Sequence, residues 1–345
     1  MCTHEEPSFF AQVQARTSQT ARPARLFPGR ARHVFAAFLH LANLRRTSVA
    51  APVGELKTDD KQFTDDSESV VTISKAVDEV RLNFTVTDKN GKFIKALRAE
   101  DFNLLDNLHP PERVNHFQAN SESPLRVVML FDISSSIRYR FDFEQKAANH
   151  FLKHVLRPGV DQAAIISFGS EVTEVQSMTG DVNKLTSAIS HLQPGGDTAL
   201  HDAVVRASRD LRSQFSPSDA RKIVIILSDG ADTTSHAKAK DCNAAAISSE
   251  ATILVVDASV PSERNSPGQI FLRKIALNSG GFVLPAREDS EIKDAFKKID
   301  GVLRNQYALS YKPADFERDG AFRSVQLSTR KRGLIAHSRN GYYAK

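Results

Sequence analysis

The chain has 345 residues, of which 41% are hydrophobic and 25% charged, with a formal net charge of +5. This length and composition are typical of a globular protein with one large domain and a smaller one. The basic excess lies mostly near the N-terminus, and no basic run carries interleaved aromatic residues, so the sequence does not indicate nucleic-acid binding. No apolar stretch is long enough to span a bilayer. Cys2 and Cys242 form no metal-binding spacing, and we expect two free thiols.

Residues 1–65 show little periodicity and are predicted to form a disordered or signal-like leader and linker. An apolar run at 34–42, followed by small residues at 48–50, is typical of an export signal. Arg45 and Arg46 interrupt that pattern. The sequence therefore leaves open whether the leader is a true signal or the product of a start codon set too far upstream.

Two separate segments are predicted to build one small β module. In the first half, residues 66–120, apolar and polar side chains alternate around Val80–Val86, the period of a half-buried strand. Asn90-Gly91 is a strong hairpin signal, with the return strand opening at Phe93, and another strand is expected at 101–106. Residues 306–345 alternate again but are too few to fold alone, so they are expected to form the second half of the module.

Residues 121–305 alternate apolar strands with amphipathic helices. The expected strands, mostly Val, Ile and Leu runs typical of parallel strands covered on both faces, are 126–132, 163–168, 172–177, 222–228, 251–257 and 281–285. Helices are expected at 141–156, with Phe143, Ala147, Phe151 and Val155 on its buried face, and at 198–213 and 289–305. This alternation predicts an α/β fold, a doubly wound, mostly parallel, Rossmann-like sheet inserted in the small β-sandwich-like module.

Polar residues cluster where these strands end or helices begin, the edge at which open α/β sheets bind ligands. They are Asp132, Ser134, Ser136, Thr198 and Asp229. Two carboxylates and three hydroxyls suit a hard divalent cation, Mg²⁺ or Mn²⁺ in preference to Ca²⁺, and helix N-termini behind Ser136 and Thr198 are expected to add positive potential. Asp197 is a candidate to reach the ion through water, or simply a helix-start carboxylate. Each segment alone is also a common capping or turn signal, so the prediction depends on their combination.

On these residues, the region 125–305 resembles a von Willebrand factor A-type domain with a metal-ion-dependent adhesion site. The family motif corresponds to the five residues just named, and His201 stands where family members often have an aromatic residue. The flanking segments resemble those of bacterial VWFA-related proteins best represented in Acidobacteria. That resemblance implies an extracytoplasmic protein, either periplasmic or secreted. The resemblance to integrin-type members, in which the last helix couples to the geometry of the site, makes the helix at 289–305 the candidate mobile element.

The favoured hypothesis is a non-catalytic, divalent-cation-dependent protein-binding module of the adhesion type, in which an Asp or Glu of a protein partner completes the metal coordination. One alternative is a structural subunit of a bacterial envelope or intracellular assembly, with a metal that only stabilises the loops. Another is a Mg²⁺-dependent hydrolase. The chain has no dinucleotide-binding glycine motif, P-loop, H-E-x-x-H or G-x-S-x-G motif, so we do not expect an enzyme. Partner identity and oligomeric state stay open.

Overall fold

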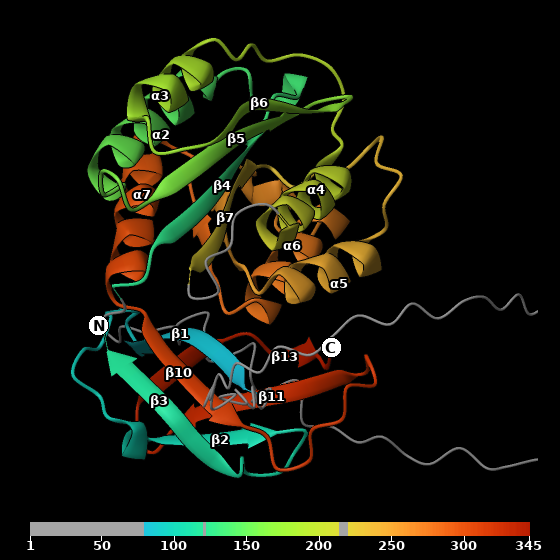
Figure 1. Cartoon of the computed structure of the whole chain (residues 1–345). Helices are drawn as coiled ribbons and strands as arrows, with labels where there is room; N and C mark the ends of the chain where they lie inside the picture. The colour runs from blue at the N-terminus through green and yellow to red at the C-terminus, as the bar shows by residue number, and fades with distance from the viewer. Residues whose placement is uncertain (1–78, 120–121, 214–219) are drawn as a thin grey trace, which may run out of the picture. The chain divides into compact units, whose positions relative to one another are not determined.

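The computed structural model describes residues 79–119, 122–213 and 220–345 (Figure 1). The predicted leader and the opening residues of the predicted β module lie outside the described residues. The segment Ala76–Lys345 forms one compact unit. It combines a six-stranded mixed sheet, flanked by helices, with two antiparallel sheets, which confirms the predicted fold class.

The six-stranded sheet has the order β6-β5-β4-β7-β8-β9. Its strands are β4 (Leu125–Asp132), β5 (Gln162–Phe168), β6 (Val172–Thr179), β7 (Arg221–Ser228), β8 (Thr252–Asp257) and β9 (Val283–Pro285). All neighbours pair in parallel except β5 and β6, which are antiparallel at one edge. After β4, the strands β5 and β6 are added on one side of it, and β7, β8 and β9 are then added on the other side. The switch in strand order therefore lies between β4 and β7, the position that favours ligand binding in such sheets.

Helices cover both faces of this sheet (Figure 1). On one face lie α2 (Phe141–Val155), α3 (Val182–Ser190) and α7 (Asp289–Arg304), and on the other α4 (Leu200–Ser213), α5 (Ala239–Ser249) and α6 (Pro267–Asn278). Alternate residues of β4 serve two cores, because Met129 packs with the first group of helices and Leu130 with the second. This two-sided burial explains why the strand sequences are almost continuously apolar. Cys242 is a buried free thiol in α5, as expected, and Cys2 lies outside the described residues.

The two antiparallel sheets draw strands from both flanks of the α/β region. Their orders are β12-β1-β10-β3 and β13-β11-β2. The strands are β1 (Val80–Asp88), β2 (Phe102–Asp106), β3 (Arg113–Ala119), β10 (Tyr307–Lys312), β11 (Phe322–Thr329), β12 (Leu334–Ser338) and β13 (Gly341–Tyr343). Phe84 of β1, Phe102 of β2 and Tyr307 of β10 meet in one aromatic core between the sheets. We call these seven strands the β lobe, and β4 to α7 the α/β lobe.

Three local predictions were wrong. Phe143 of α2 is 41% exposed, whereas its neighbour Glu144 is fully buried. The Asn90-Gly91 turn is present, but Phe93 makes a single bridge to Thr87 and no return strand follows. Finally, a short 3-10 helix at Ser135–Ile137 follows the first polar segment and α2 begins only at Phe141, so no α-helix N-terminus stands directly behind Ser136.

Candidate metal centre

Asp132 ends β4 and is completely buried. One carboxylate oxygen accepts a hydrogen bond from the Ser134 backbone N–H at 2.9 Å, and the other accepts one from the Ser228 hydroxyl at 2.6 Å. Burial raises the pKa of Asp132 to about 6 and nearby Asp229 adds to the rise, while the Ser134 and Ser228 hydrogen bonds oppose it. The fold thus holds this carboxyl group in one orientation at the strand end.

A chain of short contacts leads from Asp132 to Asp229. The hydroxyls of Ser134 and Ser136 lie 3.0 Å apart, and the Ser136 hydroxyl donates to Asp229 Oδ2 at 2.6 Å. Ser134 is buried and Ser136 is exposed, so the group opens to solvent at its outer end. The structure therefore brings four of the five predicted ligands together, from segments about 90 residues apart in the sequence.

The start of α6 holds the loop that carries Asp229. The amide of Gln269, itself 1% exposed, donates to the Asp229 carbonyl at 2.7 Å and to Asp257 Oδ1 at 2.9 Å. Gly230 has a φ of +89°, and a Cβ placed on Gly268 would lie 1.8 Å from the Gly230 carbonyl oxygen. Only a glycine at 268 lets the helix and the loop approach so closely.

Thr198 is buried just before α4 and is held by its backbone. Its N–H donates to the Thr233 hydroxyl at 3.0 Å, and its carbonyl accepts from the Thr233 N–H at 2.8 Å. Within the described residues, no hydrogen bond links the Thr198 side chain to the other four predicted ligands. The two loops do meet, because the Ser135 N–H donates to the Gly196 carbonyl at 3.2 Å.

Two further residues from the sequence prediction lie beside this centre. Asp197 is exposed, and its backbone N–H donates to the Ser170 hydroxyl at 3.1 Å. Within the described part of the chain its carboxylate makes no hydrogen bond. His201 places Nδ1 3.0 Å from Asp232 Oδ2 and sets its ring edge against Phe271. His201 therefore supports the loop that follows Asp229.

Several residues that build the centre escaped the sequence analysis. Ser228 was visible only as part of a Ser-Asp-Gly turn, although its place just before Asp229 at a strand end could have identified it as a support. Gln269 and Thr233 carry no motif, because their hydrogen bonds to the centre join distant segments. Glu144 carries no motif either, and Asp132 and Asp229 act on it only electrostatically.

The donor set of the centre suits a hard cation. Across the described segments, no three His, Cys, Asp or Glu side chains gather in a way that could hold a metal ion. The donors on offer are therefore two carboxylates and the hydroxyls of Ser134, Ser136 and Thr198. Oxygen donors with limited negative charge fit a hard divalent cation.

Residues 127–231 match the family model of the von Willebrand factor type A domain. The chain contains a von Willebrand factor type A (VWA) domain. The matched segment runs from β4 to the residues just after Asp229, so it includes all five predicted ligands of the VWA domain. No curated protein matches the sequence.

Three solved structures with similar folds are distant from this chain in sequence. A von Willebrand factor type A protein from Catenulispora acidiphila is 15% identical, with 79% of this chain and 74% of that chain covered and a TM-score of 0.44. The PilB minor pilin from Streptococcus sanguinis is 14% identical, with 53% and 62% covered and a TM-score of 0.43. Proximal thread matrix protein 1 from the mussel byssus, with a zinc-occupied MIDAS motif, is 16% identical, with 54% and 49% covered and a TM-score of 0.43. The chain thus spans less than two thirds of the pilin and of the byssus protein.

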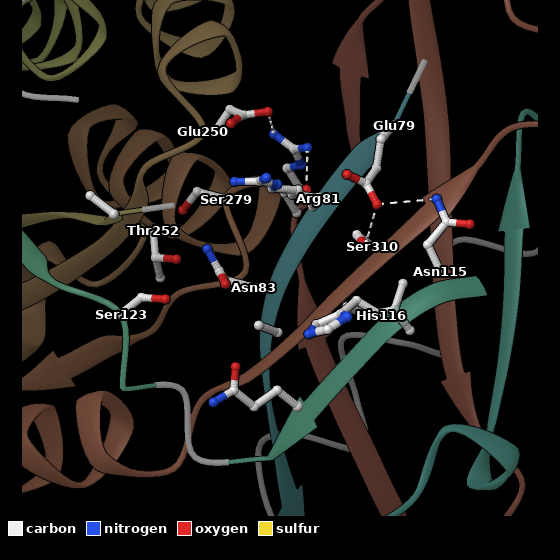
Figure 2. Close-up of a pocket in the computed structure, with 15 residues that line it drawn as sticks. Glu79, Arg81, Asn83, Asn115, His116, Ser123, Glu250, Thr252, Ser279 and Ser310 are labelled. Carbon is white, nitrogen blue, oxygen red and sulfur yellow. Dashed lines mark hydrogen bonds and ion pairs between the residues drawn. The ribbon is translucent and has the colours of Figure 1, made fainter. Parts of the chain in front are cut away.

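A hollow of about 400 Å³ lies between the VWA domain and the β lobe, near the amino-terminal ends of β7 and β8 (Figure 2). Its charged groups are engaged with neighbouring side chains. Glu79 accepts from Ser310 at 2.6 Å and Asn115 at 3.1 Å, and Arg339 pairs with Glu250 at 2.8 Å. The Glu79 contacts lie within the β lobe, whereas the Arg339–Glu250 pair joins the two lobes.

Proposed function

We propose that the VWA domain is a non-catalytic protein-binding module that holds a divalent cation, Mg²⁺ or Mn²⁺, through Asp132, Ser134, Ser136, Thr198 and Asp229. The observation that carries the proposal is the continuous set of contacts from buried Asp132 to Asp229 at the switch in strand order. Because most of these donors are neutral, a bound ion keeps its attraction for an incoming anion. An Asp or Glu of a protein partner would fill the remaining position.

In this proposal the VWA domain spans residues 121–305, and residues 66–120 and 306–345 make up the β module. We further propose an extracytoplasmic location, which is supported by the resemblance of the flanking segments to exported bacterial proteins. None of the described helices is long and apolar enough to cross a membrane.

The metal half of the proposal is tested by thermal unfolding of the full chain in EDTA and then in excess Mg²⁺, Mn²⁺ or Ca²⁺. An ion that binds only the folded state at a hundredfold excess over its Kd should stabilise it by about 2.7 kcal/mol. The rise should vanish in Asp132→Ala and persist in Ser135→Ala, an exposed neighbour outside the ligand set. An equal rise in wild type and Asp132→Ala would place the ion elsewhere.

The partner half is tested on an array of peptides that differ only in Asp against Asn or Glu against Gln. Binding should be confined to the acidic members in Mg²⁺ and should disappear in EDTA. Retention of acidic peptides in excess EDTA would disprove coordination of the partner by the ion.

A structural role is the second candidate, favoured by one observation in the β lobe. The strand β3 lies at the edge of its sheet, and most of its residues are exposed. Such an edge can pair with another chain. A Ser134→Ala/Ser136→Ala variant that assembles normally with its cellular partners would support this role over the metal-dependent one.

A further inference from the structure

Glu144 is an anomaly in the core of the VWA domain. Its side chain is 0% exposed, and neither carboxylate oxygen has a hydrogen-bond partner within the described residues. One turn earlier in the chain, Arg140 is 5% exposed and its Nε is also unpartnered. Burying an unpaired carboxyl group costs several kcal/mol unless a compensating charge, ion or water stands nearby, so this group calls for a physical explanation.

The surroundings of Glu144 point to the candidate metal centre. It lies on the buried face of α2, and Asp132 and Asp229 are both close enough to act on it electrostatically. Burial raises the pKa of Glu144 to about 8; Arg140 opposes the rise, and the two aspartates add to it. Arg140 is committed elsewhere as well, donating to the Ala286 carbonyl at 3.3 Å and to the Tyr139 hydroxyl.

We propose that Glu144 is a positioning residue of the metal centre, a third carboxyl group that strengthens the binding of a divalent cation without touching it. This inference rests on the proposed function. A cation held by Asp132 and Asp229 would bring positive charge to the surroundings of the buried Glu144 side chain, where electrostatic interactions are strong. Groups that support metal ligands from behind typically change metal affinity by about 10- to 100-fold.

The test is calorimetric titration of the full chain with MnCl₂, comparing wild type with Glu144→Gln, which keeps the side chain's shape and removes its acidity. We expect the Kd for Mn²⁺ to rise by about tenfold or more. The unfolding temperature in EDTA should stay unchanged or increase, because a neutral amide is easier to bury than a carboxylate. Weaker metal binding in an equally stable protein cannot come from a general loss of structure.

Asp142→Asn is the matched control, since it removes an exposed carboxylate from the same turn of α2 and should leave the Kd within twofold of wild type. If Glu144→Gln fails to fold, Glu144→Met offers an apolar side chain of similar length with the same expected loss of affinity. A Kd within twofold of wild type in the folded variant would overturn the inference. Glu144 would then serve only as a countercharge to the buried Arg140. Absence of Mn²⁺ binding in wild type would instead refute the proposed function and this inference together.

Discussion

Asp132 is fully buried, which disfavours its ionised form, yet it must be ionised to bind a metal ion. Burial raises its pKa from an ordinary 3.8 to about 6. Because the unfolded chain releases this proton at lower pH than the folded protein, ionising Asp132 costs stability in the metal-free protein as the pH rises from 3.8 to about 6. A cation reverses the balance, since it binds the ionised form.

We therefore expect metal-dependent stabilisation to be small at pH 5 and fully developed by pH 7.5. Below about pH 6 the affinity should fall by up to about tenfold per pH unit. The measurement is the shift in unfolding temperature caused by Mg²⁺ at a series of pH values. A shift of the same size at pH 5 and pH 7.5 would show that Asp132 does not control ion binding.

The residues around the centre also show which parts of it could be predicted from sequence patterns and which could not. The proximity of Asp132, Ser134, Ser136 and Asp229 was predictable, because they stand at or just after the ends of two strands. Glu144 was not, because the spacing of apolar residues in its helix selected Phe143 for the core. The 3-10 turn at Ser135–Ile137 delays the start of α2, and the helix then turns Glu144 inward and leaves Phe143 41% exposed. A rotation of the helix by one residue decides whether Phe143 or Glu144 faces the core, and only the packing of the folded protein determines which of them does.

Among the elements, strands were easier to predict than helices. The buried strands are long apolar runs, whereas α3 and α6 were missed. The helix α6 begins at Pro267, which fits the first turn of a helix but also resembles a loop. The missed α6 matters most, because its first turn holds the Asp229 loop in place.

Gly268→Ala tests this contact. The new Cβ would lie 1.8 Å from the Gly230 carbonyl oxygen, so the helix or the loop must move. We expect a loss of about 2 kcal/mol in unfolding free energy and weaker Mn²⁺ binding, because Asp229 is adjacent to the displaced residue. Denaturant unfolding and calorimetry measure the two effects. Gly195→Ala is the control, because its Cβ would meet no atom within 4 Å. This variant should change neither the unfolding free energy nor the Kd for Mn²⁺ strongly. A Gly268→Ala protein that binds Mn²⁺ normally would show that α6 does not position the Asp229 loop.

In the whole molecule, the insertion of the α/β lobe into the β lobe was predictable from the order of alternating and apolar segments. The contacts that join the lobes were not, because they link single residues far apart in the sequence. Arg339, with 7% of its side chain exposed, pairs with Glu250 at 2.8 Å and donates to the Arg81 carbonyl at 2.6 Å. On the other side, Arg221 donates to the carbonyls of Ser123 and Leu303, next to the two chain connections.

Arg339→Met should cost about 2 kcal/mol of unfolding free energy, the typical value for losing hydrogen bonds to a charged group. Glu250 is half exposed and so regains water, which keeps the loss moderate. The Kd for Mn²⁺ should stay unchanged, because Arg339 sits at the opposite end of the central sheet from Asp132. Scanning calorimetry and titration test both expectations, with Arg304→Met, which removes an exposed pair with Asp300, as the near-neutral control. A large change in Mn²⁺ affinity would reveal coupling between the two ends of the domain.

The pairing of β3 with β10 has a mechanical consequence. The chain enters the α/β lobe from β3 and leaves it into β10, and these two strands are hydrogen-bonded neighbours in one sheet. Suppose that a partner bound at the candidate metal centre were pulled away from the β lobe. The tension would then divide between two covalent connections, from β3 into β4 and from α7 into β10, which are anchored in the adjacent strands β3 and β10. No single linker would bear the whole load, and extending one connection would strain the other.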